Sequence, residues 1–135
     1  MSAEIDIIKN AVLGDHNSQF RLGCMYRDGN FVKADTEKAI KWFTRASEGG
    51  HSRAKYELAE LLYHSESEEA HVESFKLCRE LVEEENNKDA MFRLYLCYRY
   101  AVGTKKDLKQ AEFWVRKAIE VGHKGAVKEL ESLIH

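Results

Sequence analysis

The chain has 135 residues, of which 44% are hydrophobic and 33% are charged, and its formal net charge is −2. This length allows one ordinary domain with one hydrophobic core. The charge excludes the overall basic field that drives nucleic-acid binding, and the longest apolar runs fall far short of the ~20 residues that cross a bilayer.

The cysteines and the amino-terminal segment indicate a reducing compartment. Cys24, Cys78 and Cys97 form neither a CxxC pair nor an even set, so we expect reduced thiols rather than disulfides. The opening MSAEIDIIKN has an acidic beginning and no apolar signal core. We therefore expect a soluble cytoplasmic protein that binds neither nucleic acid nor membrane.

Apolar residues recur at helical spacing along the chain and predict seven helices followed by a short eighth. In chain order, the helices are expected at roughly 3–13, 17–28, 36–49, 53–64, 69–85, 89–101, 108–121 and 125–134. No alternating strand pattern competes, and no proline interrupts a helix.

An internal repeat underlies these helices. The segment AMFRLYLCYRYAVG at 90–103 has the same skeleton as SQFRLGCMYRDGNF at 18–31, and the columns that follow divide the distance between them into two repeats of 36 residues. The first helix of each unit shows three columns: Ser18, Ala54, Ala90, Ala126; Leu22, Leu58, Leu94, Leu130; and Tyr26, Leu62, Tyr98, Ile134. The second helix shows three more: Ala39, Phe75, Ala111; Trp42, Cys78, Trp114; and Ala46, Val82, Ala118. One unit cannot bury its own apolar face, so stacked units should supply the core.

Turn and cap residues follow the same register. Gly14, Gly50 and Gly122 share a column where a helix must stop, and Asn86 takes their place in the second unit. Asp35 and Asp107 precede the second helices as N-caps, and Ser52 is expected to cap the helix that follows it.

The string LGCMYRDGNFVKADTEKAIKWFTRASEGG, residues 22–50, resembles a Sel-1-like repeat (SLR), a relative of the tetratricopeptide repeat. The matching positions are Leu22, Gly23, Tyr26, Gly29, Val32, Asp35, Lys38, Ala39, Trp42, Phe43 and Ala46. The third unit keeps Leu94, Tyr98, Gly103, Asp107, Ala111, Trp114 and Ala118, but has Tyr95 where glycine is usual. The second unit keeps Ala54, Leu58 and Ala59 and has Cys78 in place of the tryptophan.

This resemblance implies an all-α fold, an α-solenoid of antiparallel helix pairs forming a right-handed superhelix. The single repeat domain, 1–135, would comprise a half repeat (1–14), repeats at 15–50, 51–86 and 87–122, the middle one degenerate, and a capping helix (123–135). The resemblance further implies a scaffold that binds a protein or peptide in a concave groove lined by the first helices.

Candidate partner-binding residues lie at non-core positions of these first helices. The aromatic column, defined as Phe20, Tyr56 and Phe92, has the character of a peptide anchor. Arginine and tyrosine beside it are the residue types of interface hot spots. The full candidate set is Phe20, Arg21, Arg27, Tyr56, Glu57, Tyr63, Phe92, Arg93, Arg99 and Tyr100.

Other interpretations of these residues are open. The aromatic column could pack between first helices as additional core, and the alternating Arg21, Glu57, Arg93 and Glu129 could form weak inter-repeat ion pairs. Residues 57–85 hold ten glutamates against two basic residues, either as a docking patch for a basic partner or as a solvated face. A small inhibitor or immunity-type protein that blocks a toxin or enzyme is the alternative function.

Few residue patterns in the sequence indicate catalysis. Ser52 and Lys55 match the serine-x-x-lysine pattern of penicillin-binding enzymes, a remote alternative, but neither companion motif of that site is present. His64 and His71 lack metal-ligand spacing. We expect no enzyme activity, no catalytic or metal-binding residues, no cofactor and no small-molecule substrate.

Overall fold

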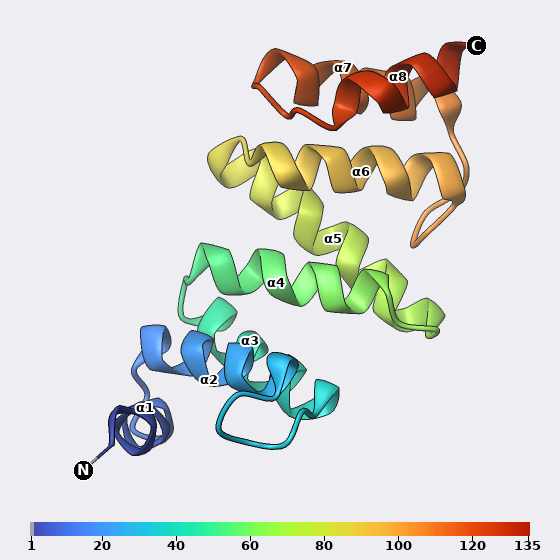
Figure 1. Cartoon of the computed structure of the whole chain (residues 1–135). Helices are drawn as coiled ribbons and strands as arrows, with labels where there is room; N and C mark the ends of the chain where they lie inside the picture. Colours follow the sequence, from blue (N-terminus) through green and yellow to red (C-terminus); the bar gives the residue numbers. More distant parts are fainter. Residues whose placement is uncertain (1) are drawn as a thin grey trace. The chain divides into compact units, whose positions relative to one another are not determined.

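The computed structural model describes residues 2–135, and all of its regular elements in that range are α-helices (Figure 1). They are α1 (Ala3–Val12), α2 (His16–Asp28), α3 (Thr36–Glu48), α4 (Ser52–Tyr63), α5 (Glu68–Glu85), α6 (Lys88–Tyr100), α7 (Leu108–Glu120) and α8 (Ala126–Ile134). Every boundary lies within one residue of the range predicted from the sequence, so the expected all-α fold is confirmed.

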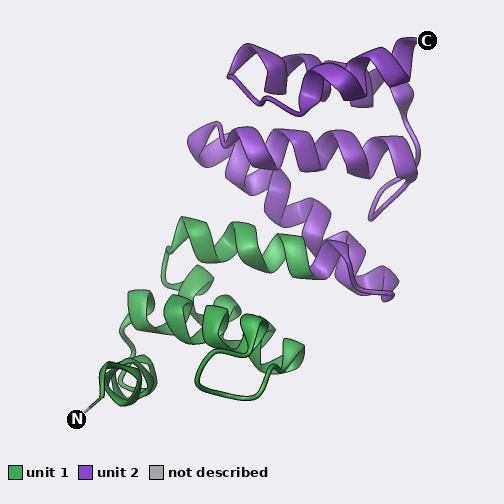
Figure 2. Cartoon of the chain, in the orientation of Figure 1, with its two compact units in different colours: residues 1–61 green, residues 62–135 purple. Residues whose placement is uncertain are grey.

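The helices are grouped in two compact units, residues 1–61 and 62–135 (Figure 2). In the first unit, α2 packs against both α1 and α3. In the second unit, α6 packs against both α5 and α7, and α8 packs against α7. In each unit, a first helix of the repeat (α2 or α6) therefore packs against two second helices. The terminal helix α8 packs against the second helix α7.

Small side chains are buried along the packed faces of both helices of the repeat. The whole first column, Ser18, Ala54, Ala90 and Ala126, is buried. In the second helices of repeats 1 and 3, Ala39, Ala46, Ala111 and Ala118 are completely buried. Because these side chains end at or near Cβ, two helix backbones can come close enough for the neighbouring leucines to interlock.

The first and third repeats distribute aromatic volume differently inside the same frame. In the first repeat, a Cβ atom on Gly23 would lie 2.6 Å from the buried ring of Phe43, so only glycine leaves room for that ring. In the third repeat, Tyr95 and Val115 stand at the two equivalent positions, and both are fully buried. The large side chain has moved from the second helix to the first, which explains how Tyr95 replaces the expected glycine.

The two tryptophans of the repeat differ in burial. Trp42 is 9% exposed and belongs to a core cluster with Ala11, Leu22 and Met25. Trp114, which stands in the same column, is only half-buried and borders a hollow. Equivalent positions of the repeat therefore differ in burial.

The physical reason lies in the preceding second helix. Ile7 of α1 packs against the cluster that holds Trp42, and Ala11 belongs to it. Two repeats later, the equivalent positions on α5 are Arg79 and Glu83, whose side chains are more than half exposed. The charged ends of Arg79 and Glu83 stay in contact with water and do not fill the space that Ile7 and Ala11 fill in the first repeat, so the third repeat keeps an opening beside Trp114.

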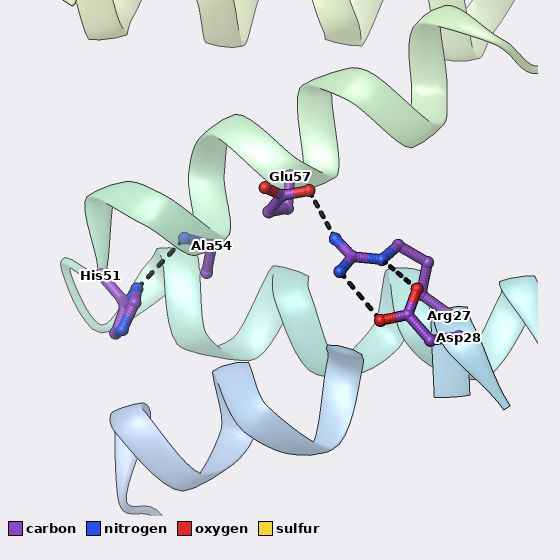
Figure 3. A network of polar contacts seen from close by, with 5 residues as sticks. All are labelled: Arg27, Asp28, His51, Ala54 and Glu57. Atoms are coloured by element: carbon purple, nitrogen blue, oxygen red, sulfur yellow. Dashed lines mark hydrogen bonds and ion pairs between the residues drawn. The ribbon is translucent and has the colours of Figure 1, made fainter. Parts of the chain in front are cut away.

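The amino ends of the first helices share one capping position. Side chains at this column accept the backbone N–H three residues later: Asp15 from Ser18 at 2.9 Å, His51 from Ala54 at 3.1 Å, and Asn87 from Ala90 at 3.0 Å. The cap of α4 is thus the imidazole Nδ1 of His51 and not Ser52, because the helix begins one residue earlier than predicted (Figure 3).

The other predicted turn residues are confirmed. Gly14, Gly50, Gly122 and Asn86 all have positive φ, and such a backbone favours glycine or asparagine. Asp35 and Asp107 accept backbone N–H bonds from Lys38 and Gln110 as N-caps.

The difference between the tryptophans predicts unequal losses of stability. Trp42→Ala should lower the free energy of unfolding by about 3–5 kcal/mol, because it empties a closed core site. Trp114→Ala should cost roughly half of that or less, because its surroundings are already open. Urea unfolding followed by far-UV circular dichroism measures both values. Equal losses would show that the hollow beside Trp114 closes in solution.

The histidine cap predicts a pH dependence of stability. Burial, with smaller contributions from His16 and Arg53, lowers the pKa of His51 below its usual value near 6.5. Only the neutral ring can accept at Nδ1, so this stabilisation is present above the pKa of the unfolded chain and is lost as pH falls through the lower pKa of the folded chain. Asn87 already performs the same capping role in α6.

His51→Asn should therefore keep the cap and reduce the loss of unfolding free energy between neutral and acidic pH. The measurement is urea unfolding of the variant and of wild type across that interval. His135→Asn, which changes an exposed histidine, is the matched control. An unchanged pH profile in His51→Asn would contradict the assignment of the cap.

Candidate partner-binding surface

Phe20 and Phe92 of the aromatic column occupy equivalent, half-buried environments. The ring of Phe20 stacks on His51 with centroids 4.6 Å apart and is tilted against Phe43 at 5.8 Å. In the third repeat, the ring of Phe92 stacks on His123 at 4.4 Å. Each phenylalanine thus contacts the turn that opens the next repeat, and neither is wholly buried nor wholly exposed. Tyr56 is likewise half-buried.

Arg27 joins α2 to α4 inside the first unit. Its guanidinium donates to Glu57 at 2.5 Å and to Asp28 at 2.9 Å (Figure 3). The hydrogen bond to Asp28 is the main reason why the pKa of Arg27 is raised. Arg27 therefore stays charged and is held by two carboxylates within its own unit.

The same contact recurs between α6 and α8 of the second unit. Arg99 lies 3.3 Å from Glu129, a partner 30 residues later, as Glu57 is for Arg27. Arg99 also donates to the hydroxyl of Tyr95 and, at 3.1 Å, to the hydroxyl of Ser132. Burial raises the pKa of Tyr95 to about 12, so this hydroxyl is protonated at neutral pH and donates to Glu129 at 2.8 Å.

A cation-π contact takes the place of the ion pair between α4 and α6. The guanidinium of Arg93 lies 4.3 Å from the centroid of the Tyr63 ring, again between residues 30 apart. Tyr63 and Arg93 stand in the columns of Arg27 and Glu57, so each inter-repeat contact joins the end of one first helix to the middle of the next. These three pairs, Arg27 with Glu57, Tyr63 with Arg93, and Arg99 with Glu129, are called the inter-repeat pairs below.

Most candidate residues thus contact other residues of this chain, in the same or a neighbouring repeat. The ion pairs suggested by the alternation of Arg21, Glu57, Arg93 and Glu129 do exist for the two glutamates, but their partners come from the column of Arg27. Arg21 and Tyr100 are exposed, the latter at 57%, with the guanidinium of Arg99 5.3 Å from the Tyr100 ring. Whether these side chains bind a partner stays a prediction.

His51 and His123 contribute to this surface although the sequence did not single them out as site residues. The buried Tyr95 supports it through its contacts with Arg99 and Glu129. The two histidines stand in the recurring strings GHSRA and GHKGA, and each follows the glycine that ends the preceding helix. Their stacking partners lie 31 residues earlier, an offset that no column alignment displays. Tyr95 attracted notice only because glycine was expected at its position.

The structure shows the surroundings of the serine, histidine and cysteine side chains that could take part in chemistry. Ser52 is exposed at the first residue of α4, and the ring Nε2 of His71 lies 2.6 Å from the carbonyl oxygen of Ser65. Burial raises the pKa of the Cys97 thiol to about 12, which makes it a poor nucleophile. Within residues 2–135, no group of three or more histidine, cysteine or acidic side chains gathers as a metal site.

None of the helices among the described residues is both long enough and apolar enough to cross a membrane.

Comparison with known proteins identifies the repeat. The model of the Sel1 repeat matches residues 16–51 and 88–123. The crystal structure of a Sel1 repeat protein from Oxalobacter formigenes aligns over 95% of this chain and 96% of that chain, with 28% identity and a TM-score of 0.70.

A protective antigen of uropathogenic Escherichia coli strains with an SLR fold aligns over 96% of this chain and 36% of that chain, with 24% identity and a TM-score of 0.49. Comparison with curated protein sequences finds no significant match. The two repeat matches cover more than half of the sequence, and the chain belongs to the Sel1 repeat family, with the all-α fold of a helical-repeat solenoid.

Proposed function

We propose that this Sel1 repeat protein is a non-enzymatic scaffold that binds a peptide or protein partner along its first helices, α2, α4 and α6. Sel1 repeat proteins are typically protein-interaction scaffolds. The observation that carries the proposal is the recurring half-buried aromatic column, flanked by exposed Arg21 and Tyr100.

The stacked aromatic rings are suited to anchoring a partner. Phe20 and Phe92 are each held by a histidine, so little side-chain entropy remains to be lost when a partner covers them. Rings that are already ordered contribute more of their buried apolar area to affinity. A partner that offers leucine, methionine or aromatic side chains would match the rings of this column.

The inter-repeat pairs assign different roles to the charged candidates. Arg27 and Arg99 already hold Glu57 and Glu129, so recruiting them to an outside carboxylate would break an internal contact. Their role in this proposal is to fix the positions of the first helices and hence of the aromatic column. Direct contact is assigned to the aromatic column, Arg21 and Tyr100.

The test compares wild type with the triple variant Phe20→Ala, Tyr56→Ala, Phe92→Ala in an affinity pull-down from the native source. Both proteins are first shown to be folded by circular dichroism and gel filtration. Phe31→Ala is the matched control, because Phe31 is 76% exposed and lies outside the column. The captured partner is then purified and titrated against all three proteins.

The triple variant should bind the purified partner at least about tenfold more weakly, as expected when hot-spot aromatics are truncated, and the control should bind as wild type does. Equal affinity of wild type and triple variant for the purified partner would remove the aromatic column from the interface and overturn the proposal.

A further inference from the structure

A hollow of about 420 Å³ opens in the second unit where α5, α6 and α7 meet. Aromatic surface is supplied by Tyr98 and Trp114, and apolar surface by Val82 and Leu94. The polar lining is Arg79, Glu83, Asp107 and Gln110. None of these residues belongs to the candidate set on the first-helix surface, so the hollow is separate from the proposed function.

The first repeat shows what normally accompanies this pair of aromatic rings. Lys38 lies 5.4 Å from the centroid of Tyr26, the equivalent of Tyr98. Arg45 and Lys41 lie 4.8 Å and 5.8 Å from the ring of Trp42, the equivalent of Trp114. Both rings therefore receive a cation from α3, an arrangement in which the negative face of the ring attracts the charge.

The third repeat has lost these internal cations. Gln110 stands in place of Lys38, and Phe113 stands in place of Lys41. Lys117 stands in place of Arg45, but its ammonium lies 5.9 Å from the Phe113 ring and 3.9 Å from Glu120. Over residues 2–135 as described, no cationic side chain lies over Tyr98 or Trp114.

Charge in the hollow favours a cation as the occupant. Two carboxylates and one guanidinium line it, so its formal charge is −1. The guanidinium of Arg79 lies 5.8 Å from the centroid of Phe75 and 4.0 Å from Glu83, and it offsets one of the two carboxylates of the hollow. The exposed glutamates of α5 add long-range attraction for a positively charged segment.

We propose that this hollow binds the cationic side chain of a basic partner segment, an arginine or a lysine stacked on Trp114 and Tyr98 and facing the carboxylates of Glu83 and Asp107. The partner would supply from outside the charge that Lys38, Lys41 and Arg45 supply within the first repeat. This gives the degenerate second repeat a role, because Arg79 and Glu83 on α5 keep the hollow open.

The probe is N-acetyl-arginine methylamide, and its uncharged isostere N-acetyl-citrulline methylamide is the matched control. The indole N–H resonances of Trp114 and Trp42 are followed by NMR during each titration, with Trp42 as an internal reference whose ring is already covered. Arginine should shift the Trp114 resonance saturably and at least about tenfold more tightly than citrulline, with weaker binding at high salt. The Trp42 resonance should not move.

A variant that supplies the cation from the chain itself distinguishes binding in the hollow from general attraction of arginine to the acidic surface. Gln110→Lys restores the lysine of the first repeat at an exposed position and should weaken arginine binding at least about tenfold. Val121→Lys adds the same charge at the other end of α7 and should leave binding unchanged. Equal binding of arginine and citrulline, equal shifts at both indoles, or full binding by Gln110→Lys would each overturn the proposal.

The triple variant Phe20→Ala, Tyr56→Ala, Phe92→Ala should still bind the arginine probe, because its changes lie outside the hollow. If the triple variant lost arginine binding while Gln110→Lys kept it, the site would lie on the first helices. That result would also overturn the proposal. The two proposals can therefore fail independently.

Discussion

The close approach of helices at buried alanine and serine is the constraint on which the rest of the structure depends. Ser18, Ala54, Ala90 and Ala126 present almost no side chain at the point of contact. A larger residue there would separate the helices by more than the leucines beside it could fill.

With this helix packing unchanged, the repeats differ in which positions carry large aromatic side chains and which carry charged ones. Gly23 with Phe43 and Tyr95 with Val115 are two distributions of aromatic volume over the same pair of positions. Replacing Ile7 and Ala11 by Arg79 and Glu83 is a larger change, because it turns core into an open hollow. Volume can move between neighbours at little cost, but a charge at a core position must reach water. The degenerate repeat is therefore where the surface becomes distinctive.

The sequence predicts the helices well because several independent features coincide every 36 residues. The apolar spacing, the helix-ending glycines and the capping aspartates all mark the same boundaries, and the structure confirms them within one residue. The cap of α4 was missed because histidine is an uncommon N-cap, and its capping ability depends on which ring nitrogen is free to accept.

Contacts between unequal positions of the repeat could not be predicted in the same way. A column aligns equivalent residues, whereas the inter-repeat pairs join residues 30 apart and the phenylalanine–histidine stacks join residues 31 apart. Those offsets depend on how neighbouring first helices cross, which is a property of packing rather than of periodicity. The lower burial of Trp114 could not be predicted for the same reason, since it depends on side chains from another helix.

The two candidate surfaces differ in how strongly substitutions in them would affect the stacking of the repeats. The first-helix surface carries the inter-repeat pairs, so substitutions there alter the stacking of repeats together with any binding. The hollow reaches Trp114 where Ile7 and Ala11 pack with Trp42 in the first repeat, and the helices around it keep their contacts without that packing. A site of this kind can acquire or lose a ligand preference through one or two side chains such as Gln110, while the alanine contacts that define the fold stay untouched.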